Sequence, residues 1–154
     1  MTIQRTGNSY STIQDALTNT IPGDVLLCDG LLTGEGNRDI TWEINNITLK
    51  ALTPTTICTI DAQSLGRIIS VEAAVNMTIE GNTMKNGLVS GAVPAGAGGA
   101  IFLPPNSNLW LNNVTFNNCT AGSGGAIYCW SADCVFANNC IFVGNSSGGG
   151  GVLQ

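Results

Sequence analysis

The chain has 154 residues with a formal net charge of −5, and only 10% of its side chains are charged, against about 25% in ordinary globular proteins. It contains no histidine, which excludes a Ser-His-Asp triad, a Cys-His dyad and histidine-ligated metals, and its acidic balance disfavours a nucleic-acid partner. The hydrophobic content of 44% argues against disorder, and the length predicts a single domain, 1–154. No apolar run reaches about 18 residues, and Met1–Arg5 opens no apolar segment, so we expect neither membrane insertion nor a signal peptide.

Residues 1–45 are predicted to form an N-terminal cap and the first coil of a repetitive fold. Ser11-Thr-Ile-Gln14 has the form of a capping box that opens a helix, whose buried face would hold Ile13, Ala16 and Leu17. Ile21-Pro-Gly-Asp24 ends this helix and turns the chain. The first strands are expected at Val25–Cys28 and Ile40–Trp42. A helix across the end of a sheet protects the unpaired backbone edge there.

Residues 46–154 carry internal repeats, and these decide the fold. Gly98-Gly-Ala-Ile-Phe102 returns after 26 residues as Gly124-Gly-Ala-Ile-Tyr128, and a looser copy, Gly149-Gly-Gly-Val152, follows after 25. A second family recurs at spacings of 30, 32 and 26 residues: Asn46–Lys50, Asn76–Glu80, Asn108–Asn112 and Cys134–Asn138. A third family follows each member of the second: Cys58–Ile60, Asn82–Met84, Val114–Phe116 and Cys140–Phe142.

Strict alternation of apolar and polar residues makes these segments strands, and they are too short for helices. Three strands in every 25–32 residues predict an all-β fold, a parallel β-helix (a solenoid) of about five coils with three strands per coil. Coils stack at about 4.8 Å, so like positions form ladders. The inner ladders are predicted to be Ile47-Met77-Leu109-Val135, Leu49-Ile79-Leu111-Ala137 and Ile60-Met84-Phe116-Phe142. The last coil, Gly148–Gln154, is expected to be incomplete and without a cap.

The outward positions of the second family predict a surface. One row holds Thr48, Thr78, Trp110 and Phe136, and the row beside it holds Lys50, Glu80, Asn112 and Asn138. In the second row Lys50 is placed to pair with Glu80 across neighbouring coils. Trp110 and Phe136, together with Phe102 or Tyr128, form the candidate contact surface. The alternative is that a loop or a terminal segment covers them.

Two resemblances add to this interpretation. Ser9–Asp61 resembles the start of right-handed parallel β-helix proteins of the pectin-lyase-like superfamily, in which a short helix, Pro-Gly-Asp and a strand precede a Gly-Asn-Arg-Asp-Ile stretch, here Gly36–Ile40. The Gly-Gly-Ala-Ile copies and Phe142-Val-Gly-Asn145 resemble the repeats of polymorphic outer-membrane proteins, a family of surface adhesins. Together they imply a right-handed solenoid, but this superfamily includes lyases, hydrolases, adhesins and structural proteins. The chain departs from the Phe-x-x-Asn element after Phe116, where asparagine stands at Asn117 and Asn118.

The six cysteines are Cys28, Cys58, Cys119, Cys129, Cys134 and Cys140, and no Cys-x-x-Cys occurs among them, which argues against a zinc or thioredoxin-type site. Cys28 and Cys58 are 30 residues apart, about one coil, so stacking brings their Cα atoms within disulfide range. Cys129 and Cys134 flank a turn and form a second candidate pair. The alternatives are buried free thiols and intermolecular bonds.

Five Asn-x-Ser/Thr sequons, at Asn46, Asn76, Asn113, Asn118 and Asn145, are candidate glycosylation sites in a secreted setting. The better-supported account of these asparagines is structural. Asparagine tolerates the left-handed backbone of coil corners, and its amides form stacked ladders.

Charge is unevenly distributed along the chain. Nine of the ten acidic and all five basic residues precede position 86, and Asp133 is the only charge after it. A neutral surface suits a chain that neighbours cover, and the alternative is an uncovered surface that is neutral because it is rich in Asn, Ser and Thr. We therefore predict a non-enzymatic structural protein, extracellular or on the cell surface, that self-assembles into a sheath, layer or filament or acts as an adhesin. Its expected partners are copies of itself, through the open C-terminal coil and the neutral faces, and surface glycans, with no cofactor and no metal.

Two other functions are weighed against this one. A polysaccharide lyase or hydrolase would use Asp61 and Glu80 with Arg67 or Lys85, but the two carboxylates are expected on different sides of the solenoid. A carbohydrate- or ice-binding module would use outward threonines and aromatics. On the predicted outer face threonine gives way to Trp110 in later coils, so no regular threonine array is expected.

Overall fold

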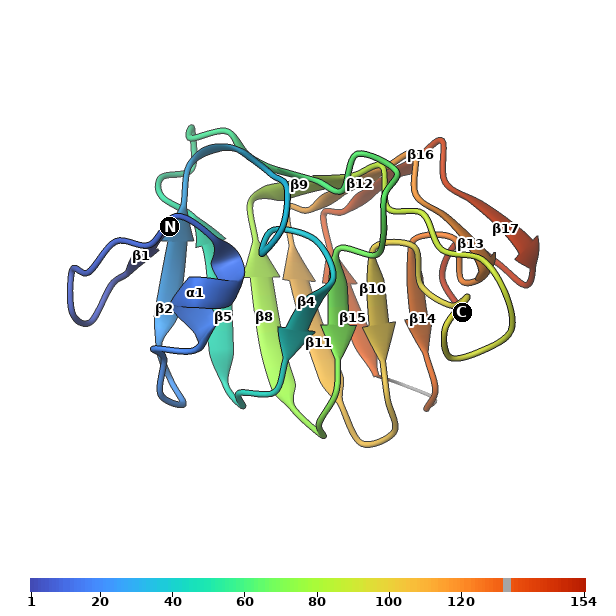
Figure 1. Cartoon of the computed structure of the whole chain (residues 1–154), viewed down its shortest axis with the longest axis horizontal. Helices are drawn as coiled ribbons and strands as arrows, with labels where there is room; N and C mark the ends of the chain where they lie inside the picture. Colours follow the sequence, from blue (N-terminus) through green and yellow to red (C-terminus); the bar gives the residue numbers. More distant parts are fainter. Residues whose placement is uncertain (132–133) are drawn as a thin grey trace.

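The computed structural model describes residues 1–131 and 134–154 and shows an all-β solenoid of about five turns, running from the N-terminus to the C-terminus along its long axis (Figure 1). One short helix, α1 (Ile13–Leu17), lies near the N-terminal end. Within the described residues, no helix is long and apolar enough to cross a membrane. Asp133, the single charge in the second half of the sequence, lies outside the described residues.

Like positions in successive coils pair to build three main sheets. Sheet A has the order β1-β2-β5-β8-β11-β15, formed by Thr2–Ile3, Val25–Cys28, Ile47–Ala51, Asn76–Glu80, Asn108–Asn112 and Val135–Asn138. Sheet B has the order β16-β12-β9-β6-β3, formed by Ile141–Val143, Thr115–Asn117, Asn82–Lys85, Cys58–Asp61 and Gly30–Thr33. Sheet C has the order β14-β10-β7-β4, formed by Ile127–Cys129, Ile101–Leu103, Ile69–Val71 and Ile40–Trp42. A fourth, small sheet pairs β13 (Thr120–Ser123) with β17 (Ser146–Gly149).

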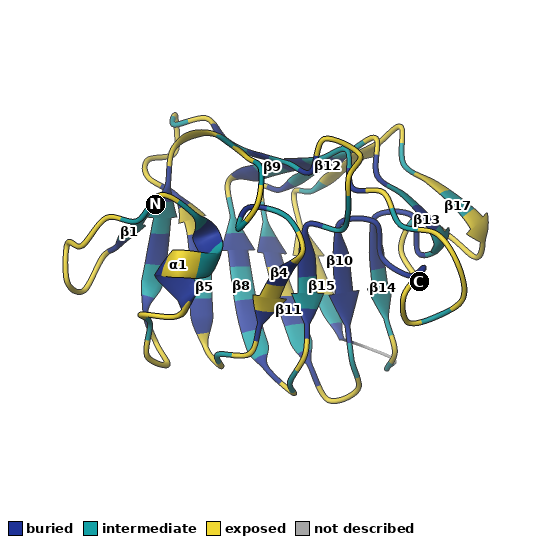
Figure 2. Cartoon of the chain, in the orientation of Figure 1, coloured by how far each residue is buried: buried dark blue, intermediate teal, exposed yellow. Residues whose placement is uncertain are grey.

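The register of the strands confirms the predicted inner ladders. Leu109 pairs with Met77 on one side and Val135 on the other, and Phe116 lies between Met84 and Phe142. In the middle coils these inward side chains are fully buried, and Figure 2 shows the same alternation of buried and less buried positions along the strands. Each fully buried aliphatic or aromatic side chain stabilises the fold by about 1.5–3 kcal/mol, so the ladders are a main source of stability.

Asparagine and glycine make the corners of the coils. Asn113 and Asn118 both have φ 54°, in the left-handed region that asparagine tolerates, as predicted. Backbone geometry also explains the glycines of the Gly-Gly-Ala-Ile repeat. Gly124 has φ 58°, and a Cβ atom on Gly125 would strike the backbone oxygen of Ser146 in the following coil. The repeat therefore marks a place where two coils approach too closely for any side chain.

The N-terminal segment covers one end of the solenoid, as Figure 1 shows. The helix begins later than the capping box predicts, because Thr12 and not Ser11 is the N-cap, and the Thr12 hydroxyl accepts a hydrogen bond from the Asp15 N–H. The predicted apolar face is confirmed, since it is buried against the core: Ile13, Ala16 and Leu17.

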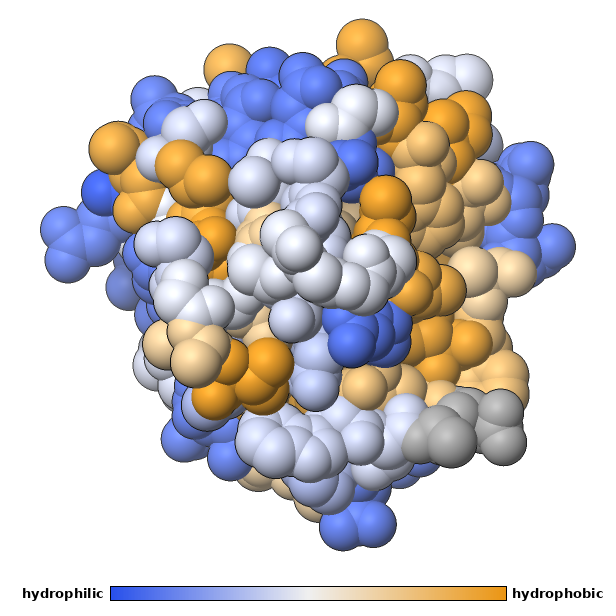
Figure 3. Space-filling view, turned by 90° about the vertical axis from the view of Figure 1, so that its right-hand side faces the viewer, coloured by the Kyte–Doolittle hydropathy of each residue, from blue (hydrophilic) through white to orange (hydrophobic). Residues whose placement is uncertain are grey.

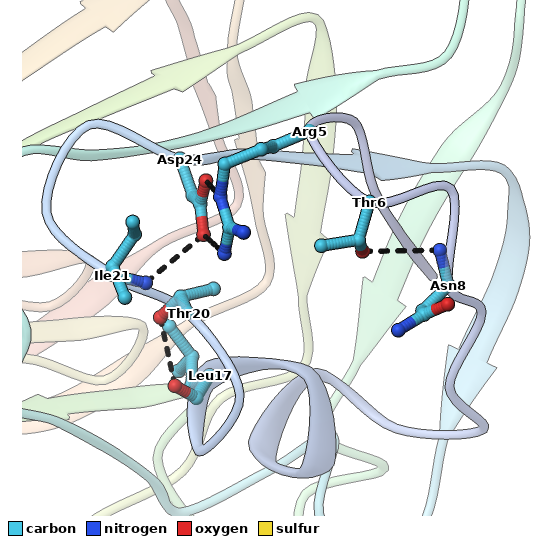
Figure 4. A network of polar contacts seen from close by, with 7 residues as sticks. All are labelled: Arg5, Thr6, Asn8, Leu17, Thr20, Ile21 and Asp24. Carbon is cyan, nitrogen blue, oxygen red and sulfur yellow. Dashed lines mark hydrogen bonds and ion pairs between the residues drawn. The ribbon is translucent and has the colours of Figure 1, made fainter.

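Asp24 fixes the turn between α1 and β2 (Figure 4). Its buried carboxylate accepts two hydrogen bonds from the Arg5 guanidinium, at 2.6 and 2.8 Å, and one from the Ile21 N–H at 2.9 Å. The bond from Arg5 lowers the pKa of Asp24, and this effect outweighs burial, which raises it. Asp24 is therefore ionised at neutral pH and ties the first strand to the turn.

Candidate binding surfaces

The outward side of sheet A carries the predicted row of threonines and aromatics. The register places Trp110 between Thr78 and Phe136, with Thr48 beside Thr78. The rings of Trp110 and Phe136 stack at 5.4 Å with 12° between their planes, and the residues are 38% and 47% exposed. Because the planes stack from one coil to the next, each ring covers a face of the other. In the neighbouring row the predicted ion pair is present, with 3.0 Å between Nζ of Lys50 and Oε2 of Glu80.

Phe102 and Tyr128 lie on sheet C, so the prediction that they join Trp110 and Phe136 in one surface is wrong. Their rings stack at 6.0 Å on the outward side of β10 and β14. Phe102 is only 7% exposed, because the Arg67 guanidinium lies 5.3 Å from the centre of its ring and Trp130 packs against it.

Trp130 is the residue on sheet C that the sequence analysis missed. It is 51% exposed and packs nearly perpendicular to both stacked rings, at 6.2 Å from Phe102 and 6.4 Å from Tyr128. Trp130 follows Tyr128 by two residues but lies beyond the end of β14, so the alternation within the strand does not determine the direction of its side chain.

The C-terminal end of the solenoid exposes residue positions that are buried in earlier coils. Phe142 stacks on the buried Phe116 at 5.0 Å but is 37% exposed. Phe136, Ile141 and Val143 are exposed nearby, and Figure 3, which faces this end, shows apolar surface gathered along one side. Among the described residues β15 and β16 each pair with one strand, so their other edges are open.

Sheet B carries an outward threonine row. Thr59, Thr83 and Thr115 pair in direct register across three coils. The expected end of the threonine row is confirmed on sheet A, where Trp110 follows Thr78, whereas the threonine row of sheet B was not predicted. Its second row is charged, because Lys85 pairs with Asp61 at 3.3 Å.

The side chains considered for a lyase site lie apart. Asp61 is on sheet B with Lys85, whereas Glu80 is on sheet A, as the sequence analysis expected. Arg67 stands near sheet C, where its guanidinium donates hydrogen bonds to the carbonyls of residues 94, 95, 97 and 98, and burial lowers its pKa. Within residues 1–131 and 134–154, no three His, Cys, Asp or Glu side chains gather in a way that could hold a metal ion.

Both candidate cysteine pairs are disulfides. Cys28–Cys58 joins two sheets across neighbouring coils, with Cα atoms 5.8 Å apart, and Cys129–Cys134 closes a short loop after β14, with Cα atoms 6.6 Å apart. The remaining two cysteines are free. Burial raises the pKa of Cys119 to about 11, so its thiol stays protonated and unreactive at neutral pH.

The sequon asparagines take part in the corners. Asn46 has φ 57°, like the corner residues Asn113 and Asn118. The Asn76 amide oxygen accepts a hydrogen bond from Asn108 at 2.8 Å, which is one of the predicted amide ladders. Asn145 is engaged at both amide atoms, since its oxygen accepts from the backbone of residue 119 and its nitrogen donates to the backbone oxygen of residue 116.

These features define a β-solenoid repeat protein with aromatic rows on two outward faces. The Chlamydia polymorphic membrane protein repeat family matches residues 113–129. This segment runs from a corner asparagine through β12, β13 and β14 and contains the whole second copy of the repeat, Gly124–Tyr128. No curated protein and no solved structure matches the chain.

Proposed function

We propose that this protein is an outer-surface, adhesin-like β-solenoid that binds a partner through its outward faces. The observation that carries the proposal is the match of residues 113–129 to the polymorphic membrane protein repeat. The matched segment includes Tyr128, which belongs to the aromatic cluster on sheet C. The two disulfides support an extracellular location, because such bonds persist in oxidising compartments.

Adhesion is tested with beads coated with the purified, oxidised chain and incubated with cultured epithelial cells. We expect saturable attachment that an excess of the free chain abolishes, whereas beads coated with the reduced and unfolded chain should not attach. Antibody labelling of intact producing cells tests the location. Failure of the coated beads to attach, or attachment that the free chain does not compete, would overturn the adhesin proposal.

We further propose a right-handed winding with three strands per coil, as in the pectin-lyase-like superfamily. The order of the strands, which pass repeatedly from sheet A to sheet B and on to sheet C, supports three main strands per coil, with β13 as an extra strand in one of them. The right hand is proposed on the general rule that crossovers between parallel strands are right-handed. The proposed role is non-enzymatic, because the candidate acidic residues Asp61 and Glu80 are engaged in ion pairs on different sheets. Release of unsaturated sugars from polysaccharide by the purified chain would overturn this part.

Self-assembly is a second candidate, favoured by the exposed apolar end. Phe142 belongs to a ladder whose earlier members are buried, but its own side chain is exposed to water. The open edges of β15 and β16 offer unpaired backbone groups to a strand of another molecule. Light scattering and electron microscopy at increasing concentration should show larger species that Phe142→Asp abolishes. Ile57→Asp is the matched control, because Ile57 is exposed elsewhere. A monomer at every concentration would contradict the proposal.

A further inference from the structure

The outward side of sheet C combines an exposed indole with polar side chains. Ser70, Phe102 and Tyr128 stand side by side in register on β7, β10 and β14. Two residues further along the chain, just past the ends of these strands, come Glu72, Pro104 and Trp130. The Ser70 hydroxyl donates a hydrogen bond to the Glu72 carboxylate at 2.6 Å, which places this carboxylate on the outward side too.

The geometry of the aromatic cluster leaves half of Trp130 exposed to solvent. Its distances to the two stacked rings are nearly equal, 6.2 and 6.4 Å, and its plane is turned by 82° and 89° from theirs. The indole therefore lies beside the Phe102–Tyr128 stack and packs against both rings at once. An exposed aromatic face that other rings support is suited to stacking against the C–H face of a sugar.

Trp130 is held at its backbone and at its side chain. Its backbone N–H donates to the Leu103 backbone oxygen at 3.1 Å, and the neighbouring Cys129 is bonded to Cys134. The indole packs against Phe102 and Tyr128, and a side chain that is held before binding loses less entropy when it binds.

The charges on this side favour an uncharged ligand. The Arg67 guanidinium donates to backbone carbonyls and, at 3.2 Å, to the Ser70 hydroxyl, and it lies over the Phe102 ring, whereas the Glu72 carboxylate is exposed. A carboxylate with free lone pairs accepts hydrogen bonds from hydroxyl groups and repels anions. The apolar residues exposed around Trp130 are few, with Tyr128 and Pro104 half-buried and Pro105 exposed, which is far less than a stable protein interface needs.

We propose that the outward side of sheet C binds a neutral oligosaccharide along the solenoid axis, with one sugar stacked on Trp130 and another hydrogen-bonded to Glu72. Trp130 and Glu72 are two coil spacings apart along the solenoid axis, about 10 Å, a length that a short oligosaccharide spans with sugars that are not adjacent in its chain. This inference rests on the proposed adhesin-like function and names the chemistry of its partner.

The test uses the oxidised full chain on immobilised neutral oligosaccharides of glucose, mannose, galactose and N-acetylglucosamine, with sialylated and uronate oligosaccharides beside them. Calorimetry with the best neutral ligand then gives Kd. We expect binding to neutral sugars, a loss of at least tenfold in Trp130→Ala, a smaller loss in Glu72→Gln and partial retention in Trp130→Phe. Trp110→Ala is the matched control, because it removes an exposed indole from sheet A, and its Kd should not change.

Several results would overturn the inference: no binding to neutral sugars at millimolar concentration, preference for anionic sugars, or an unchanged Kd in Trp130→Ala. Circular dichroism shows whether each variant is folded, and Trp130→Phe keeps the test valid if Trp130→Ala does not fold. The bead assay separates the two proposals. If wild-type and Trp130→Ala beads attach to cells equally, adhesion stands and the sugar site falls. If oligosaccharides bind through Trp130 but beads do not attach, the adhesin proposal falls and the sugar site stands.

Discussion

The aromatic ladder inside sheet B makes a quantitative prediction about stability. Phe116 and Phe142 occupy the same inward position in neighbouring coils and stack at 5.0 Å, but Phe116 is fully buried and Phe142 is 37% exposed. Replacing Phe116 with alanine leaves a closed cavity below Phe142 and should lower the free energy of unfolding by about 3–5 kcal/mol. Phe142→Ala removes the same atoms from a position with one open side, so we expect a loss of about 1–2 kcal/mol.

The measurement is urea unfolding of the oxidised protein, followed by circular dichroism and by tryptophan fluorescence. Trp42 is fully buried near the N-terminal end and Trp130 lies near the C-terminal end, so tryptophan fluorescence reports on both ends of the solenoid. If the fluorescence and circular dichroism transitions coincide, the solenoid unfolds as one unit. The experiment is repeated at a hundredfold dilution, because covering of Phe142 by a second copy would make its loss depend on concentration. Equal losses in the two variants at low concentration would refute the argument that burial within the ladder sets the stability.

Three further predictions concern covalent, electrostatic and backbone restraints. Cys58→Ser opens a disulfide that spans 30 residues and should lower the free energy of unfolding by about 3.5 kcal/mol. Cys134→Ser opens one that spans 5 residues and should lower it by about 2 kcal/mol. Equal urea midpoints for the two variants would contradict this prediction. The pKa of Asp24 is lower in the folded protein than in the unfolded chain, so the stability that its ionised form contributes is present above its ordinary pKa, near 4, and is lost as pH falls through the folded value. The melting temperature of Asp24→Asn should therefore vary less with pH than that of the wild type below about pH 4. Parallel curves of melting temperature against pH would refute this prediction. Gly125→Ala places a Cβ atom against a backbone oxygen and should lower the free energy of unfolding by about 2 kcal/mol or more. In Gly148→Ala the nearest atom to the new Cβ is 3.5 Å away, an ordinary contact, so the change should stay within about 0.5 kcal/mol. Similar melting temperatures for the two variants would rule out this explanation of the glycine pair.

The core could be predicted from the sequence because the solenoid repeats one simple rule. Alternation fixed which residues point inward, and a spacing of about one coil was enough to pair Cys28 with Cys58. The threonine row of sheet B can also be predicted from the sequence, since each threonine directly precedes a residue of the Ile60-Met84-Phe116 inner ladder and must therefore point outward. The sequence analysis does not contain this row, because it follows only the outward positions of the second repeat family.

The candidate site on sheet C was harder to predict because it depends on residues beyond the strands. Trp130 follows β14 and Glu72 follows β7, where alternation no longer determines the direction of a side chain. The disulfide after β14 and the packing of the indole across two rings set its orientation. The division of the four predicted aromatics between two sheets likewise follows from which sheet each repeat family enters, and the spacing alone does not give that assignment.

The register between the last coils has a consequence for how the length of such a protein changes. In both sheet A and sheet B, each residue pairs with the one 26 positions later, Leu111 with Ala137 and Phe116 with Phe142. A duplication of 26 residues in this region would therefore insert one rung, about 4.8 Å, and leave every ladder matched, because each coil contacts only its neighbours. Other coils use other spacings, such as 23 between Leu26 and Leu49 and 29 between Ile40 and Ile69, because the loops between strands absorb the difference in length. Duplication of one such coil in the gene would thus lengthen the solenoid by one coil spacing and move a binding face along its axis by the same distance.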